Sequence, residues 1–530
     1  MAFTGLLVLI ATAALLTACQ GGEPNYIASD QPTVQAYVAD ETGTLQETEP
    51  LVRGTECMAR SDTIDGYMAV DIGDETYYVS PTNLAPSEEE SVQEQQLFVR
   101  TPATIYKDTN SPQIAGFAPK GSELQVTGHT KVRGDGTVKL YQVKYGDTTG
   151  YVYGKYLTGD EASAKKNCNK NGAYDMAKDA TFSTDLHGGE ATGLDYYPCP
   201  FTPIKGNEFC DKARGIYLHA GAAVSDKYFE LAKSSGANVA VINIDGGTLA
   251  YRSPVAEKLC PSAYKDAQHS VEDYQKAVQR YKDAGFYTIG RIVAFNDEHF
   301  AADHEDACIL SGGKKTKWVS AYSRSAWEYK VSVAIEAVET MGFNEIQFDY
   351  VRFPEGSYEM SISGDTDFRN QYDETKAQAI QNFCLYAADQ IHEAGAYVSI
   401  DVFGECSNGY VTAYGQYWPA ISNVVDAISA MPYTDHFGEE DTWTEPYSCL
   451  NQWAKRSADM QAHIPTPAVA RTWITGYNTP HWNPTVSYDY EKLHDQVRAL
   501  EDAGLDGGFI PWNSKCEFRK YEQYIRIWSE

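Results

Sequence analysis

The chain has 530 residues, of which 43% are hydrophobic, and its 43 Lys and Arg against 73 Asp and Glu give a formal net charge of −30. This length suits two to four domains with sizeable cores. The acidic balance argues against nucleic-acid binding, which needs a basic surface, and is compatible with a protein that handles neutral polymers.

The first 19 residues resemble the signal of a bacterial lipoprotein. An apolar run from Phe3 to Leu16 is short for a membrane span, and it leads into Leu16-Thr17-Ala18-Cys19. The resemblance implies cleavage before Cys19 and lipidation of its thiol, although the usual early Lys or Arg is absent. An ordinary secretory signal or a buried helix is the alternative. We expect an exported protein of the cell surface or envelope, attached to the membrane through this lipid alone.

Cysteine usage agrees with export. Of 11 cysteines, ten remain besides Cys19, and an even set in an exported chain predicts disulfides, whose pairing the sequence leaves open. No Cys-x-x-Cys pair occurs, so we expect no structural zinc site. The ten are Cys57, Cys168, Cys199, Cys210, Cys260, Cys308, Cys384, Cys406, Cys449 and Cys516.

Two blocks, residues 33–86 and 97–159, have the short alternating runs and turn signals of small β domains. Residues 20–32 before them are polar and are interpreted as a tether, and the acidic residues 87–96 as a linker. Each block ends on Tyr-Val, four further residues and Leu, which is a weak internal repeat.

The second block resembles a bacterial SH3-like domain in Gly150-Tyr151-Val152 and Tyr156-Leu157, and the first block resembles one less well. In exported proteins such domains bind cell-wall peptides or glycans, or serve as spacers. Both roles stay open for this chain.

After a Cys-containing linker over residues 160–212, strands and helices alternate through residues 213–530, which indicates a parallel sheet. Eight such units fit the α/β class and a (β/α)8 TIM barrel. An open doubly wound sheet is disfavoured, because no glycine fingerprint follows the first strand. The expected strands are Ala213–Ala220, Asn238–Gly246, Phe286–Phe295, Glu345–Phe353, Tyr397–Gly404, Asp426–Tyr433, Thr466–Ile474 and Gly508–Trp512.

The fourth strand carries the strongest functional signal. It begins as an apolar strand at Glu345, ends at Pro354, and places Asp349 and Arg352 near its end. A charge in an apolar strand is costly unless it is paired or functional, and the C-terminal ends of barrel strands line active sites. Asp349 is therefore the first catalytic candidate, and a structural ion pair between Asp349 and Arg352 is the alternative.

Other strand ends supply the equipment of glycoside hydrolysis, which needs two carboxylates. Asp401 lies on the next strand, about 4.8 Å away, and Glu405 lies farther into the loop as a second choice of acid. Mutual repulsion would raise one carboxyl pKa, as suits an acid. His219 and His436 give a metal site little support, so we expect no metal or other cofactor. Candidate sugar-binding residues are Asp245, Arg291, Arg352, Tyr433, Asp435, Arg471, Trp473 and Trp512.

Residues 213–528 resemble a family of glycoside-hydrolase-like (β/α)8 barrels once catalogued as a domain of unknown function. The matching motifs include Arg214–Tyr217, Ile346–Pro354, Asp401–Gly404 and Gly508–Asn513. The resemblance implies a glycan substrate and a nucleophile at Asp349. The family usually has an aromatic residue where Glu405 stands, which favours Asp401 as the acid, and the loop of residues 297–320 carries an added charged, Gly-rich stretch.

The sequence thus predicts a surface-anchored lipoprotein glycoside hydrolase that acts on an extracellular or cell-wall polysaccharide. The alternative is a non-catalytic glycan-binding or wall-attachment lipoprotein whose barrel has lost its chemistry. The two hypotheses differ in what Asp349→Asn does, because only the first predicts loss of turnover.

Overall fold

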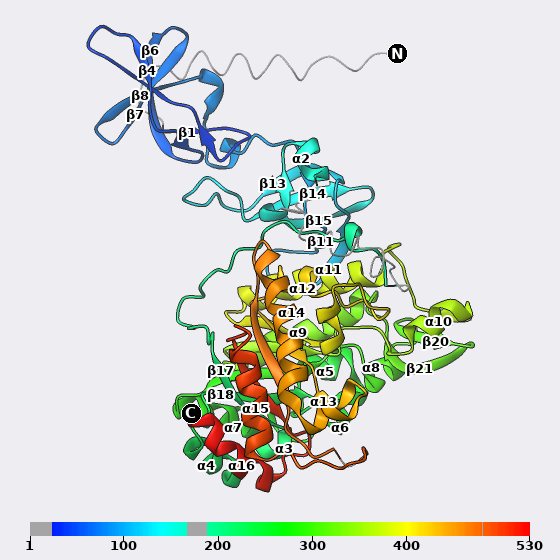
Figure 1. Cartoon of the computed structure of the whole chain (residues 1–530). Helices are drawn as coiled ribbons and strands as arrows, with labels where there is room; N and C mark the ends of the chain where they lie inside the picture. Colours follow the sequence, from blue (N-terminus) through cyan, green and yellow to red (C-terminus); the bar gives the residue numbers. More distant parts are fainter. Residues whose placement is uncertain (1–23, 167–187, 480) are drawn as a thin grey trace. The chain divides into compact units, whose positions relative to one another are not determined.

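The computed structural model describes residues 24–166, 188–479 and 481–530. The chain divides into two compact units, residues 1–166 and residues 167–530 (Figure 1). Within the described ranges no helix combines the length and the apolar character needed to cross a bilayer. The expected lipoprotein signal and Cys19 lie outside the described residues.

The first unit contains two seven-stranded antiparallel sheets, as predicted for small β domains, and ends in one short helix, α2 (Glu161–Lys165). The first has the order β4-β3-β8-β7-β6-β1-β9 and the second the order β12-β11-β15-β14-β13-β10-β16, so the two match strand for strand. The first sheet is built from β1 (Asn25–Ile27), β3 (Tyr37–Ala39), β4 (Leu45–Glu47), β6 (Glu56–Ile64), β7 (Tyr67–Ile72), β8 (Glu75–Val79) and β9 (Leu84–Ala85). The second is built from β10 (Gln96–Val99), β11 (Ala103–Tyr106), β12 (Ile114–Ala118), β13 (Glu123–His129), β14 (Leu140–Tyr145), β15 (Thr148–Tyr153) and β16 (Leu157–Thr158).

The Tyr-Val repeat marks the same corner in both sheets. In each case a strand ends, one 3-10 turn follows, and the Leu opens the last short strand, at Leu84 in one sheet and Leu157 in the other. The sequence repeat therefore reflects two copies of one topology.

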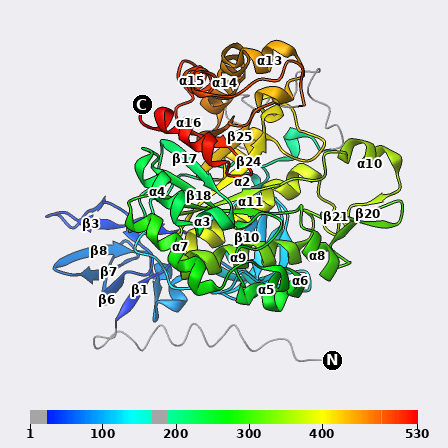
Figure 2. The ribbon, with the colours of Figure 1, turned by 90° about the horizontal axis from the view of Figure 1, so that it is seen from below.

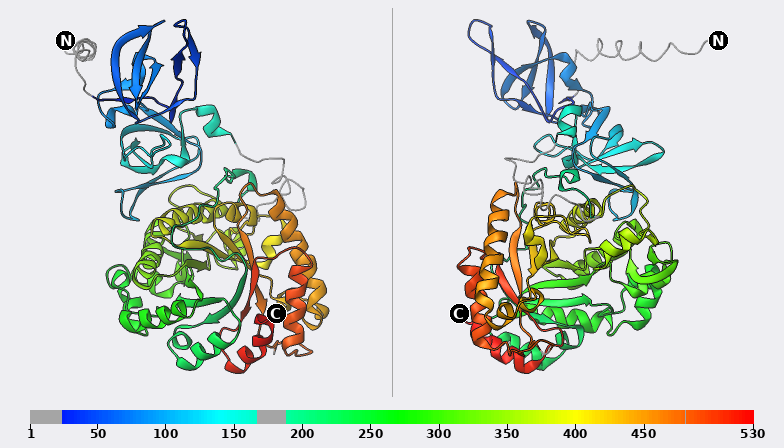
Figure 3. Two further views of the ribbon diagram at one scale, coloured as in Figure 1. Left: turned by 90° about the vertical axis from the view of Figure 1, so that its left-hand side faces the viewer. Right: turned by 45° about the vertical axis from the view of Figure 1, so that its right-hand side comes forward.

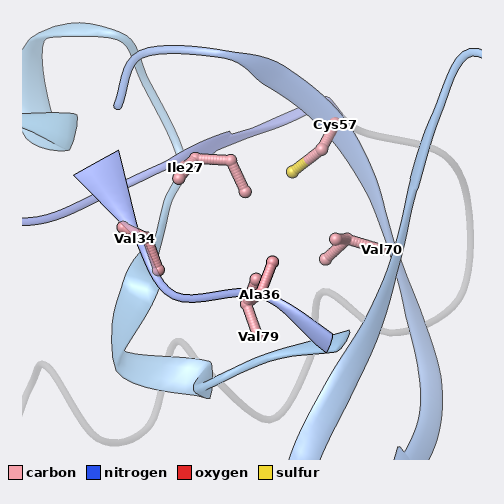
Figure 4. Packing of buried hydrophobic residues seen from close by; sticks show 6 residues of the cluster. All are labelled: Ile27, Val34, Ala36, Cys57, Val70 and Val79. Carbon is pink, nitrogen blue, oxygen red and sulfur yellow. The ribbon is translucent and has the colours of Figure 1, made fainter. Parts of the chain in front are cut away.

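The tether expected over residues 20–32 is wrong from residue 25 onward. Strand β1 pairs with β6 and β9, and Ile27 is fully buried in the core of the first sheet with Val34, Val70 and Val79 (Figure 4). A strand of three residues is too short to show alternation, so the sequence pattern could not reveal it.

The connection between the two sheets, expected as a simple linker over residues 87–96, is pinned by a buried ion pair. Arg53 Nη1 donates to Glu94 Oε1 at 2.5 Å, and the Tyr141 hydroxyl donates to the same oxygen at 2.7 Å. Arg53 also donates to the Gly136 carbonyl. The two β domains are therefore joined through packed polar contacts.

The second unit is a closed barrel of eight parallel strands, which confirms the predicted fold. Figures 2 and 3 show its helices lying outside the strands. The strands, in their order around the barrel, are β17 (Ala213–Leu218), β18 (Val239–Asp245), β19 (Tyr287–Val293), β22 (Glu345–Asp349), β24 (Tyr397–Phe403), β25 (Ala427–Met431), β26 (Val469–Thr475) and β27 (Gly508–Trp512).

The helices of the second unit start and stop at ordinary capping signals. Helix α9 begins after Ser323, whose hydroxyl accepts from a backbone N–H, and ends at Gly342 with a left-handed φ of 71°. Helix α9 spans Arg324–Met341, and the other helices include α3 (Ala220–Ala223), α4 (Asp226–Ser234), α5 (Pro254–Leu259), α6 (Pro261–Asp266), α7 (Val271–Asp283), α8 (Glu298–Asp303), α10 (Ser357–Ser363), α11 (Lys376–Glu393), α12 (Trp418–Ser422), α13 (Glu440–Thr444), α14 (Pro446–His463), α15 (Tyr490–Glu501) and α16 (Phe518–Trp528).

The loop of residues 297–320 folds into a small extra sheet. Strands β20 (Cys308–Ser311) and β21 (Lys314–Val319) form a hairpin, and β23 (Thr366–Asp367) pairs with β20. Figures 1 and 2 both place helix α10 beside this sheet. The added Gly-rich stretch is the hairpin turn, where Gly312 and Gly313 both take positive φ.

Eight of the ten cysteines that were predicted to form disulfides are not part of one in the described residues. Eight cysteines have free thiols, and most are buried in separate elements, as Cys384 is in α11 and Cys57 in β6. Here cysteine serves as a small buried apolar residue. Cys168 lies outside the described residues. The eight are Cys57, Cys210, Cys260, Cys308, Cys384, Cys406, Cys449 and Cys516.

Candidate active site

Asp349 is the last residue of β22 and lies at the carboxyl end of the barrel, as predicted. Tyr350 follows it in the left-handed region, with φ of 55°. Its backbone N–H donates to Asp349 Oδ1 at 2.6 Å. A non-glycine residue there costs roughly 1–2 kcal/mol, and such strain gathers at functional sites. The turn at Tyr350 thus aims a backbone donor at the carboxylate.

Arg291, in β19, connects the two predicted catalytic aspartates. Its Nη2 donates to Asp349, its Nη1 donates to Asn243 Oδ1 at 3.1 Å, and its Nε lies 3.8 Å from Asp401 Oδ2. Arg291, Asp349 and Asp401 are all buried. Asp349 is therefore paired with Arg291 and not with Arg352, so the alternative of an Asp349–Arg352 ion pair is wrong.

Asp401 lies one layer deeper than Asp349. It is 1% exposed and does not line the pocket, and Oδ1 accepts from the Trp473 indole N–H at 2.9 Å. Oδ2 has no hydrogen-bond partner within the described ranges. Burial, with the nearby Asp349 charge, raises the pKa of Asp401 well above its usual value, although Arg291 opposes this. Its surroundings thus favour the protonated form of Asp401, which lies beneath the pocket.

A pocket of about 650 Å3 opens above Asp349. Glu405 also lines this pocket. It lies in the turn of residues 404–408, directly after β24, and its side chain is exposed. The hydroxyls of Tyr410 and Tyr414 donate to Glu405 at 2.5 and 2.7 Å and fix its orientation. Of the three predicted catalytic carboxylates, Asp349 and Glu405 are the two that face the pocket.

Aromatic side chains and a second arginine complete the pocket wall. Tyr433, Trp473 and Trp512, three of the candidate sugar-binding residues, line it. Arg352 also lines it, with its guanidinium 4.4 Å from the Phe403 ring and its Nη2 donating to Glu355 at 2.9 Å.

Three predicted sugar-binding residues do not line the pocket. Asp245 is buried in an ion pair with Lys330 of α9, and Asp435 accepts from the Tyr477 hydroxyl. Arg471 is fully buried and pairs with Glu345, the first residue of β22. Arg471 therefore lies near the amino-terminal end of the strands, as the third residue of β26, and not at the carboxyl end where the site was predicted.

Sequence reasoning missed several side chains around the site. Tyr350 stood next to Asp349, but its positive φ has no sequence signal. Tyr410 and Tyr414 lie four residues apart after Glu405, a spacing that could have been noticed. Lys330 left a detectable signal, because it shares one helical face with the buried Ala334 and Ala337.

The histidines at strand ends do not form a metal cluster. His219 Nδ1 accepts the Ala222 backbone N–H at 3.1 Å and caps α3, and burial lowers its pKa. Within the ranges that the structure describes, no three His, Cys, Asp or Glu side chains are placed to hold a metal ion.

A closed parallel barrel with carboxylates, an arginine and aromatic side chains at its carboxyl end has the layout of a barrel enzyme site. A family described as "Putative glycosyl hydrolase domain" matches residues 215–518. The chain belongs to this family of glycosyl hydrolase domains.

Solved structures give more distant likenesses. A hypothetical protein from Ruminiclostridium thermocellum is 27% identical, over 35% of this chain and 97% of its own, with a TM-score of 0.30. The PgaB (BpsB) glycoside hydrolase domain from Bordetella bronchiseptica is 11% identical, over 60% of this chain and 99% of its own, with a TM-score of 0.44. A GH18 chitinase from Pseudoalteromonas aurantia is 8% identical, over 59% of this chain and 97% of its own, with a TM-score of 0.36. No curated protein matches the chain.

Proposed function

We propose that the chain is a glycoside hydrolase that cleaves an extracellular or cell-wall polysaccharide, with Asp349 and Glu405 as its working carboxyls. The observation that carries this proposal is the pocket they share. Asp349 receives two oriented donors on its buried side, and Glu405 is held by two tyrosine hydroxyls on the open side. Family membership supports the same reaction.

In this mechanism Glu405 gives a proton to the glycosidic oxygen as its bond to the anomeric carbon breaks. Asp349 either attacks that carbon or removes a proton from the attacking water. In both cases one water is consumed, one new reducing end appears, and the leaving sugar departs with a free hydroxyl. Aromatic rings of the pocket wall would contact the sugar faces.

The sequence favoured Asp401 as the catalytic acid, but this proposal gives it a different role. Its carboxyl is covered by Trp473 and Arg291 and has no access to the pocket. We assign it as a positioning residue that accepts the Trp473 indole N–H and so orients that ring in the pocket wall. The proton donor is then Glu405, where the family usually has an aromatic residue.

The test is release of reducing ends from neutral, amino-sugar and uronic-acid polysaccharides by the chain from residue 20 onward. Asp349→Asn and Glu405→Gln are each expected to lower kcat by about 10²–10⁴-fold. Glu405→Gln changes an exposed side chain and is expected to leave the thermal midpoint unchanged. Asp211→Asn, a change at an exposed aspartate outside the pocket, is the matched control. Product formation by Asp349→Asn at the wild-type rate would contradict the assignment, and glycan retention without any product would favour the non-catalytic binder.

We also propose that the mature protein is a lipoprotein attached to the membrane through Cys19, which would hold the β domains at the cell envelope. The proposal is supported by the Leu16–Cys19 sequence. A clickable fatty acid fed to the expressing bacterium is expected to label the wild-type chain and not Cys19→Ser. Equal labelling of both chains would rule the anchor out.

A further inference from the structure

A second pocket, of about 490 Å3, lies over the half of the barrel that the catalytic pocket leaves uncovered. Its lining comes from β17, β18, β19 and β27 and from residues just beyond their carboxyl ends, such as His219, Thr248, Asn296 and Ser514. Those four strands are neighbours in the closed barrel. The catalytic pocket draws most of its lining from the other four, β22, β24, β25 and β26.

The two pockets meet beside Asp349. They share three lining residues, Arg291, Tyr350 and Trp512. Arg291 on β19 and Tyr350 after β22 stand where one half of the barrel adjoins the other, and Trp512 on β27 stands at the opposite junction, next to β26. Because the same side chains form both walls, the space above Asp349 continues in two directions.

The second pocket presents neutral polar groups. Gln268 and Asn296 line it, and their side-chain amides make no hydrogen bond to the residues that the structure describes. An amide both donates and accepts, which matches sugar hydroxyls. The charged group in the lining is Arg291, whose guanidinium already donates to Asn243 and Asp349. Tyr217 and Trp512 add aromatic faces.

We infer that this second pocket is a sugar subsite on the far side of the scissile bond from Glu405, so that the enzyme cuts inside chains of neutral sugars. The inference rests on the proposed function. Substrate would lie across the whole barrel mouth, with Asp349 beneath the bond that breaks. The volume of the second pocket, about 490 Å3, is within the usual range of about 300–1,000 Å3 for ligand sites.

The experiment follows polymer mass, by light scattering, and new reducing ends during digestion of the polysaccharide that the wild-type chain cleaves. Internal cutting is expected to lower the weight-average mass steeply within the first cut or so per chain, before monosaccharides accumulate. Release of small sugars with almost unchanged polymer mass would overturn the inference and leave the hydrolase standing. Absence of reducing ends from every polysaccharide would overturn the proposed function and this inference with it.

A double variant, Gln268→Ala with Asn296→Ala, tests the pocket itself. Loss of hydrogen bonds from two amides is expected to lower kcat/KM on the polymer about tenfold or more, mainly through KM. Gln268 is exposed and Asn296 half-buried, so the fold should persist, and an unchanged thermal midpoint checks this. Gln452→Ala, at an exposed glutamine of α14, is the matched control. Wild-type kinetics in the double variant would overturn the inference.

Discussion

Asp401 shows how burial and a neighbouring charge can change what a carboxyl does. Asp349 and Asp401 end up on neighbouring strands with one arginine between them. Two carboxylates beside a single guanidinium leave one negative charge unpaired, and this cost raises the pKa of the deeper group, Asp401. The shallower Asp349 is the one that meets the pocket.

A pH dependence of stability follows from the raised pKa of Asp401. Between about pH 4, where an aspartate of the unfolded chain ionises, and the higher pH where the buried group ionises, the folded state holds one extra proton. The free energy of unfolding therefore falls as pH rises through this window, by at most about 1.4 kcal/mol per pH unit. Asp401→Asn, which keeps an acceptor for Trp473, should remove this slope.

The measurement is urea unfolding of wild type and Asp401→Asn from pH 4 upward. The stability of wild type minus that of the variant is expected to fall with rising pH. A difference that stays constant across the range would mean that Asp401 is ionised in the folded state, against the assignment of a protonated carboxyl.

The same residues show how far sequence reasoning reaches. Asp349 could be predicted, because a charge at the end of an apolar strand is rare and the barrel directs strand ends to the site. Asp245 and Arg471 were placed wrongly, because alternation tells which side chains point inward and not at which depth. Depth depends on strand tilt and on distant partners such as Lys330 and Glu345, which no local pattern reveals.

At the scale of elements, all eight strands were predictable and their ends were less so. The fourth strand was expected to run to Phe353 but ends at Asp349. Tyr350 leaves the extended conformation there, and this turn is what presents the carboxylate. At the site, the strand therefore ends before its apolar sequence pattern does, because the backbone turns to present the carboxylate.

Helix α9 is tied to the barrel mouth by Lys330, whose Nζ lies 2.6 Å from Asp245 Oδ2 and 2.7 Å from Asp297 Oδ2. All three side chains are buried. Lys330→Met would leave two buried carboxylates without a counter-charge, so we expect it to lower the free energy of unfolding by about 3–5 kcal/mol. Urea unfolding measures the loss, and Lys276→Met, at an exposed lysine of α7, is the control.

The triple variant Lys330→Met, Asp245→Asn, Asp297→Asn separates charge from packing. Asparagine can still accept the backbone N–H groups of Gly247 and Phe300 that the aspartates accept. The triple variant should therefore recover much of the stability that Lys330→Met loses. No recovery would mean that the loss comes from packing of the lysine stem, and the ion-pair account would be wrong.

For the whole molecule, the structure combines a repeated β domain with a barrel. The two seven-stranded sheets share one strand order, although the sequence betrays the repeat only in the Tyr-Val-to-Leu spacing. The two sheets differ in most of their side chains but keep the same strand order and the same turn before the last strand. The repeat is therefore clearer in the topology than in the sequence. The fold of the barrel could be predicted because strands such as β18 and β24 are largely apolar and buried, as parallel strands covered on both faces are.

The two units of the chain are expected to fold independently of each other. Each has its own buried core, and a segment with its own core can fold alone. We expect residues 24–166 and residues 167–530 to be soluble when expressed separately, and calorimetry of the whole chain to show two transitions that match those of the fragments.

Both catalytic carboxyls and both pockets lie within the second unit. The barrel fragment should therefore release reducing ends from soluble oligosaccharides at the rate of the whole chain. A single transition in the whole chain, together with an inactive barrel fragment, would show that the barrel needs the β domains to fold, and the β domains would then be part of the catalytic structure.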